Sequence, residues 1–121
     1  MAPKIGRSRS GSRDESAGFR FIIGWYADQC DGEWEHEFGV KIETIDNPGW
    51  SVTIDLVDTE AHGSLLEFST IELPRRGWIG AMSDGERFIA SGSPGAASEI
   101  DQAFEDFIAG RALPSDLGHG G

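Results

Sequence analysis

The sequence predicts an α+β fold, in which an antiparallel β-meander of about five strands is flanked by an N-terminal and a C-terminal helix that pack on one face. Three observations predict this fold. Apolar residues recur at helical spacing near both ends of the chain, they alternate with polar residues in between, and turn-forming residues separate the alternating runs. Strands grouped in the middle of a chain, with helices kept to its ends, are typical of the α+β class.

The N-terminal helix is expected over residues 17–29. Its apolar positions recur three and four residues apart, with Trp25 beside them, and they are Phe19, Ile22, Ile23 and Tyr26. This spacing places them on one face of a helix, which can then pack against a sheet.

The longest alternating run covers residues 33–44 and predicts a strand with two different faces. One face carries Trp34, His36, Phe38, Val40, Ile42 and Thr44, and the other carries Glu33, Glu35, Glu37, Gly39, Lys41 and Glu43. His36 is therefore expected among the apolar side chains. The three glutamates Glu33, Glu35 and Glu37 are expected to form an acidic ladder, with side chains about 6.6 Å apart. Gly39 is a candidate bulge.

A second strand follows at residues 50–56, and the two strands are expected to form a hairpin with a five-residue loop, 46–50. Pro48 and Gly49 suit the central positions of a type II turn. The register that keeps one face apolar pairs Thr44 with Val52, Ile42 with Ile54 and Val40 with Leu56. The same register sets Lys41 opposite Asp55, a favourable cross-strand pair.

Three more strands are expected at residues 65–73, 77–83 and 86–91, with Asp84-Gly85 as a tight turn. The C-terminal helix is indicated by an apolar stripe at Ile100, Ala103, Phe104, Phe107 and Ile108. Ser98 and Asp101 resemble a capping box, Ser93-Pro94 offers an earlier start, and Gly110 fits the end of the helix.

The 121 residues suit one domain, which we expect to span residues 18–112. Residues 1–17 are rich in Ser, Gly and Arg and predict a disordered basic tail, and 113–121 predict a flexible tail. The formal net charge is −11, and it is uneven because the first 13 residues carry +4. An acidic body repels nucleic acid and membrane surfaces, and it attracts basic partners.

Cys30 is the single cysteine of the chain, so no internal disulfide can form, which fits a reducing cytoplasm. No run of 18 apolar residues marks a membrane span, and we expect neither a signal peptide nor an anchor. Cys30 itself is expected to be a small buried residue at the end of a helix.

Residues 30–37 concentrate side chains that are capable of chemistry, namely a cysteine, a histidine and several carboxylates. On a strand, His36 and the glutamates point to opposite faces and do not converge on one ion, and the spacing fits neither an EF-hand nor a zinc-binding HExxH motif. We therefore expect no catalytic residue, no metal and no cofactor. A small metal-dependent or Cys/His hydrolase built on this segment remains an alternative, as does an acidic mimic of nucleic acid.

Residues 25–56, WYADQCDGEWEHEFGVKIETIDNPGWSVTIDL, resemble the immunity protein 53 family of bacterial polymorphic toxin systems. The similar pieces are Trp25-Tyr26, QCDG followed by WEH, GVKIET, and DNPGWSVTIDL. The resemblance implies a small cytoplasmic protein without enzymatic activity that binds and neutralises a cognate toxin encoded by a neighbouring gene. It would be a monomer when free.

The expected contact with the toxin is an acidic surface facing a basic, nuclease-type effector domain, since opposite charges accelerate association. The interface candidates are Asp31, Glu33, Trp34, Glu35, His36, Glu37, Glu43, Asp46 and Trp50. Trp34 and Trp50 are expected to be core aromatics, and they are included because a tryptophan at a strand end can also be a half-exposed interface anchor.

Overall fold

The computed structural model describes residues 18–75 and 77–111 of the chain, so the expected tails 1–17 and 113–121 lie outside the described residues. Within these residues helices occupy both ends and strands the middle, with a short helical turn between the first helix and the first strand. In chain order the elements are α2 (Arg20–Gln29), α3 (Trp34–Glu37), β1 (Val40–Ile45), β2 (Gly49–Asp55), β3 (Leu65–Leu73), β4 (Gly77–Asp84), β5 (Arg87–Gly92), η2 (Pro94–Ala96) and α4 (Ala97–Ala109).

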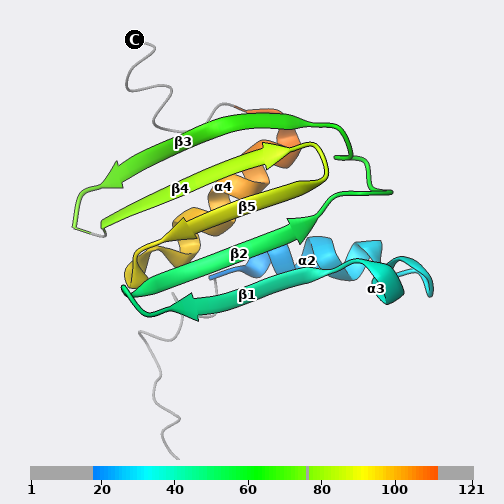
Figure 1. The fold of residues 1–121 in the computed structure, drawn as a ribbon, viewed down its shortest axis with the longest axis horizontal. Helices are drawn as coiled ribbons and strands as arrows, with labels where there is room; N and C mark the ends of the chain where they lie inside the picture. The colour runs from blue at the N-terminus through cyan, green and yellow to red at the C-terminus, as the bar shows by residue number, and fades with distance from the viewer. Residues whose placement is uncertain (1–17, 76, 112–121) are drawn as a thin grey trace, which may run out of the picture.

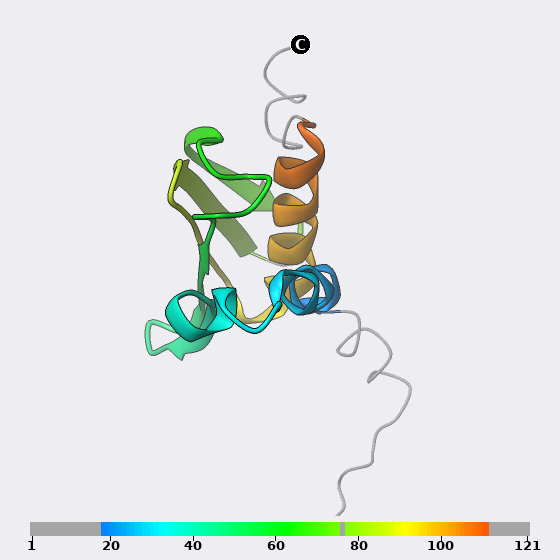
Figure 2. The same ribbon diagram turned by 90° about the vertical axis from the view of Figure 1, so that its right-hand side faces the viewer.

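The five strands form one antiparallel sheet, and α2 and α4 cover the same face of it (Figures 1 and 2). The expected α+β class, with two helices on one face, is therefore confirmed. The strand order is β1-β2-β5-β4-β3, which differs from a simple meander because β2 pairs with β5 and not with β3. Val52 and Ile54 of β2 are fully buried, and a place near the middle of the sheet lets the helices cover them.

The core lies between the helices and the sheet and is built around Phe88 and Phe104, which are both fully buried. Their ring centroids lie 5.0 Å apart, and Trp25 of α2 meets Phe104 edge-on at 5.1 Å. The apolar stripe expected for the last helix faces this core through Ile100, Ala103 and Phe104. The two helices and the sheet thus share one aromatic cluster, and such ring pairs add to the stability of the packed state.

The register of the β1–β2 hairpin differs from the expected one. Ile42 lies opposite Val52, and not opposite Ile54, and the connection is the three residues 46–48, and not the five residues 46–50. The peptide bond between Asn47 and Pro48 is cis, and Gly49 has a φ of 159°, which is not the φ of about 80° that the third position of the expected type II turn requires. The side-chain parity is the same in both registers, so β1 still presents its apolar residues to the helices.

The expected cross-strand pair of Lys41 with Asp55 is absent, because the observed register sets Lys41 opposite Thr53. Lys41 Nζ lies 3.8 Å from a carboxylate oxygen of Glu43 on its own strand, and Asp55 Oδ1 accepts a hydrogen bond from Arg87 Nε at 3.2 Å. Arg87 is the residue opposite Asp55 on β5. The favourable pair therefore forms across the β2–β5 boundary instead.

The long strand expected over 33–44 is wrong in its first half, because residues 34–37 form the helical turn α3 and the strand begins only at Val40. Trp34 and Phe38 are four residues apart, so their spacing suits one face of a helix as well as alternate positions of a strand. Their ring centroids lie 6.0 Å apart. Polar side chains around Asp31 decide between the two conformations, and consequently the acidic ladder of Glu33, Glu35 and Glu37 does not exist.

The last helix begins at the earlier of the two expected starts, since η2 opens at Pro94 and continues into α4. Gly110 ends it in the left-handed conformation with φ 76°, as expected. The capping box of Ser98 with Asp101 is wrong, because both lie inside the helix. The Asp101 carboxylate instead accepts hydrogen bonds from the first turn of α2.

Candidate functional site

The segment between α2 and α3 is held by two carboxylates that accept hydrogen bonds from backbone N–H groups. Asp31 Oδ1 accepts from Glu33 N at 2.9 Å and from Trp34 N at 3.0 Å, so it caps the start of α3. Glu35 reaches back and accepts from Asp31 N at 3.0 Å and from Gly32 N at 2.9 Å. This reciprocal arrangement resembles a capping box and explains why a period-2 sequence turns into a helix here.

The hydrogen bonds also set the charge of this segment. The N–H groups of Trp34 and Glu33 hold the pKa of Asp31 below its usual value, because they stabilise the ionised carboxylate. Asp31 therefore carries its negative charge at neutral pH.

Trp34 packs α3 against the core of the protein. Its side chain is 6% exposed, and its indole Nε1 donates a hydrogen bond to the carbonyl oxygen of Val57 at 2.9 Å. Its ring meets those of Trp25 and Tyr26 with centroids 6.1 Å apart. Trp34 is therefore a core residue, as expected, and its burial does not fit the alternative of a half-exposed anchor.

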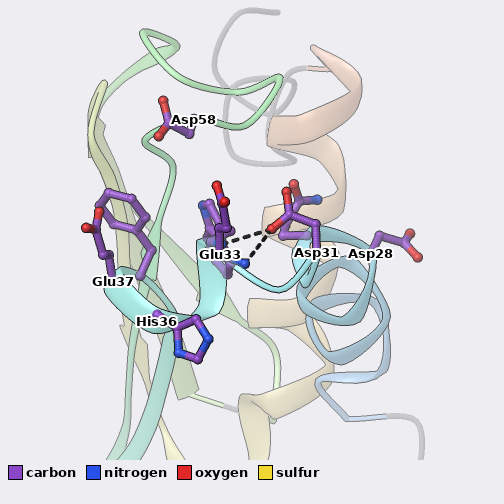
Figure 3. A pocket seen from close by; sticks show the side chains of 9 residues that line it. Asp28, Asp31, Glu33, His36, Glu37 and Asp58 are labelled. Carbon is purple, nitrogen blue, oxygen red and sulfur yellow. Dashed lines mark hydrogen bonds between the residues drawn. The ribbon is translucent and has the colours of Figure 1, made fainter.

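A hollow of about 500 Å³ lies between the end of α2, the turn of α3 and the β2–β3 connection (Figure 3). Among the described residues, its lining carries five carboxylates and no lysine or arginine, and we call it the acidic cleft. The five are Asp28, Asp31, Glu33, Glu37 and Asp58. Trp34 lines it as an apolar wall. Figure 3 shows that the carboxylates come from three separate segments of the chain.

His36 also lines the acidic cleft, and its side chain is exposed. The expectation that it lies among the apolar core residues is wrong, because the helical turn directs it away from the sheet. In Figure 3 its ring points away from Asp58. Cys30 is exposed as well, contrary to expectation, and its Sγ lies 3.4 Å from the carbonyl oxygen of Tyr26.

Of the nine interface candidates, the structure gathers five around the acidic cleft, which are Asp31, Glu33, Trp34, His36 and Glu37. Glu35 lies beside them, and its carboxylate is engaged by the backbone N–H groups of the preceding loop. The sequence thus identified the segment that lines the cleft, although it predicted a strand there and the structure has a helical turn.

The other three candidates lie towards the opposite end of the β1–β2 hairpin (Figure 1). Glu43 follows the cleft residue Phe38 by five residues, or roughly 17 Å of extended chain at about 3.3 Å per residue, and Asp46 lies farther along. Glu43 and Asp46 are exposed there. Trp50 is half-buried, its ring meets Phe19 edge-on at 5.2 Å, and its Nε1 donates to the carbonyl oxygen of Pro94 at 2.9 Å. These residues are not part of the acidic cleft.

Two cleft residues, Asp28 and Asp58, were missed by sequence reasoning. Asp28 lies near the C-terminus of α2, where a negative charge is unfavourable to the helix dipole and so has no local structural reason. Asp58 follows β2 and has a left-handed backbone with φ 65°, which is uncommon outside glycine and asparagine-like residues. The unfavourable position of Asp28 could be read from the sequence, whereas the placement of Asp28 and Asp58 beside α3 could not.

The described carboxylates of the cleft are exposed, and carboxylates attract cations and accept hydrogen bonds. Within residues 18–75 and 77–111, no group of three or more His, Cys, Asp or Glu side chains is arranged to hold a metal ion. Within the part of the chain that the structure describes, the ion-paired basic residues Lys41, Arg87 and Arg111 do not line the cleft. The described lining residues therefore do not neutralise its negative charge.

Comparison with known proteins places the chain in one family. None of the helices in the described residues is long and apolar enough to cross a membrane. No curated protein and no solved structure matches the chain. The family model of immunity protein 53 matches residues 19–109, which include both long helices, α3 and all five strands. The chain therefore belongs to the immunity protein 53 family, whose members are immunity proteins of toxin systems.

Proposed function

We propose that this protein neutralises a cognate toxin by direct, non-catalytic binding in the cytoplasm, and that the acidic cleft is its main docking surface. The observation that carries the proposal is that five carboxylates, and no lysine or arginine of the described residues, line one exposed hollow. Family membership supports a toxin as the partner. A basic effector domain, such as a nuclease that binds nucleic acid, would present the complementary charge.

The acidic cleft suits this role because it combines a rigid frame with free charges. Asp31 and Glu35 use their carboxylates to hold the loop, and Trp34 fastens α3 to the core. Glu33 and Glu37 are exposed on that frame, as is Asp58 across the hollow. Charged groups held in place before binding lose little side-chain freedom when a partner arrives.

The test measures association with the toxin domain encoded by the neighbouring gene, at low and at high salt. The cleft variant Glu33→Gln, Glu37→Gln, Asp58→Asn removes three negative charges. Within the described residues, these three carboxylates accept no hydrogen bond that holds the fold together. A matched control, Glu67→Gln, Glu72→Gln, Glu86→Gln, removes three exposed charges elsewhere. We expect the cleft variant to slow association by about tenfold at low salt, with little difference at high salt, and the control to slow it much less.

Growth of a host that expresses the toxin reports the same contact in cells. Wild-type protein should restore growth and co-purify with the toxin in a one-to-one complex. Equal effects of the two triple variants would show that the cleft has no special role. A wild-type protein that restores growth without binding the toxin would refute direct neutralisation.

A further inference from the structure

The strand β1 is an edge of the sheet, with β2 on one side and no other strand of the described residues on the other. Asp55 N donates to the carbonyl oxygen of Gly39 at 3.0 Å, which sets the alternation of hydrogen bonds along the hairpin. In an antiparallel pair every second residue directs its N–H and C=O towards its neighbour. The backbone groups of Val40, Ile42 and Thr44 therefore point away from β2.

An apolar groove of about 210 Å³ runs between α2 and β1. It is lined by Ile22, Ile23, Tyr26, Val40 and Ile42. Ile23 is 59% exposed, which is unusual for a large aliphatic side chain on a helix that packs on a sheet. Val40 and Ile42 thus contribute to this surface in two ways. Their side chains line the groove, and their backbone N–H and C=O groups point away from β2.

The groove and the acidic cleft lie next to each other along the same seam. Tyr26 lines the groove and Trp34 lines the cleft, and the centroids of their rings lie 6.1 Å apart. On the strand side, Phe38 of the cleft precedes Val40 of the groove by two residues, or about 6.6 Å of extended chain. A chain that followed β1 would pass from apolar surface to negative charge within a few residues.

We propose that the outer edge of β1 receives an extended segment of the partner as a sixth strand. Its aliphatic side chains would enter the α2–β1 groove, and lysine or arginine residues beyond the Val40 end would enter the acidic cleft. Added strands of this kind bind through main-chain hydrogen bonds and gain specificity from pockets for alternate side chains. The inference rests on the proposed function, since it takes the toxin as the source of the segment.

The negative charge of this protein favours a basic partner at the outer edge of β1 over a second copy of the chain. Two copies paired through β1 would bring together two chains that each carry a formal charge of −11, with both acidic clefts beside the shared seam. Like charges of this size oppose association, whereas a basic segment relieves the repulsion among the cleft carboxylates.

The direct test is residue-resolved hydrogen exchange of this protein, alone and saturated with the toxin domain from the neighbouring gene. In the free protein the amides of Val40, Ile42 and Thr44 face solvent and should exchange rapidly. In the complex we expect them to slow by at least about tenfold, as new main-chain hydrogen bonds form. Unchanged exchange at all three amides in the saturated complex would overturn the proposal.

Two variants with matched controls test the same contact by affinity. Thr44→Pro removes an outward N–H without removing a ladder bond, and proline is tolerated on edge strands in that orientation. Thr44→Val keeps the N–H and is its control. Ile23→Ser removes a groove side chain, and Ile89→Ser, on the uncovered sheet face and 38% exposed, controls for loss of apolar surface. We expect about a tenfold rise in Kd for Thr44→Pro and for Ile23→Ser, and less than about threefold for each control.

The outcomes separate this inference from the proposed function. Wild-type affinity in both Ile23→Ser and Thr44→Pro, together with slower association of the cleft variant, would overturn the added strand and leave the acidic docking surface intact. Wild-type protein that does not bind the toxin would overturn both. If Thr44→Pro does not fold, hydrogen exchange and Ile23→Ser decide the matter.

Discussion

The start of α2 is capped by a side chain from the other end of the chain, and this contact gives a sharp stability prediction. Phe19 precedes the helix in a left-handed conformation, φ 61°, and supplies no side-chain cap. The N–H groups of Phe21 and Ile22 donate instead to the two carboxylate oxygens of Asp101 on α4, each at 2.8 Å. The Asp101 side chain thus joins the two helices and occupies the role of an N-cap.

Asp101→Ala removes both acceptors at once. The residue is only 7% exposed, so water has poor access to replace the carboxylate. Losing a helix cap costs about 0.5–2 kcal/mol, and a buried N–H without a partner costs about 1–3 kcal/mol. We expect the free energy of unfolding to fall by about 2–4 kcal/mol, which for a domain of this size lowers the Tm by roughly 10–20 °C.

The matched control is Asp84→Ala. Asp84 Oδ1 also accepts two backbone N–H groups, from Glu86 at 2.9 Å and Arg87 at 3.0 Å, but it lies in an exposed turn. Water can replace it there, so we expect a loss below about 1 kcal/mol. Urea and thermal unfolding, followed by circular dichroism, measure both variants. A loss for Asp101→Ala no larger than that for Asp84→Ala would refute the long-range cap.

Three further predictions concern the same fold. Burial raises the pKa of Asp101 despite the hydrogen bonds from Ile22 and Phe21, so the folded state holds this proton more tightly than the unfolded state. The stabilising effect of its titration is then fully present below the usual aspartate pKa and is lost as the pH rises through the raised value. In urea titrations from acid to neutral pH, the stability of wild type relative to Asp101→Asn should therefore decline. Gly24→Ala, in α2 with nothing within 4 Å of the added Cβ, should stabilise the protein by about 0.5–1 kcal/mol. Gly49→Ala should destabilise it by about 2 kcal/mol or more because the Cβ would collide with the carbonyl oxygen of Gly92, and equal stability of the two glycine variants would contradict this packing.

The sequence predicted which segment of the chain carries much of the candidate site, but it did not predict the conformation of that segment. The stretch from Asp31 to Glu37 stands out by its carboxylates, and five of its residues do line the acidic cleft. The sequence predicted a strand here because Trp34 and Phe38 belong to an alternating pattern. Residues four apart also lie on one face of a helical turn, which is the conformation that forms. The deciding interactions are hydrogen bonds that nearby backbone N–H groups donate to the carboxylates of Asp31 and Glu35, which a hydrophobic pattern does not report.

The sequence by itself determined the α+β class, the two long helices, and β3 to β5 to within about one residue, because local periodicity and turn residues are written along the chain. The motifs of residues 25–56 indicated the family by their resemblance to it. Only the tertiary structure decided that β2 lies beside β5, that Asp101 caps α2, and that Asp28 and Asp58 join α3 around one cleft. These contacts join residues distant in sequence. They depend on how the helices and the sheet bury their apolar faces together, and no local pattern encodes that arrangement.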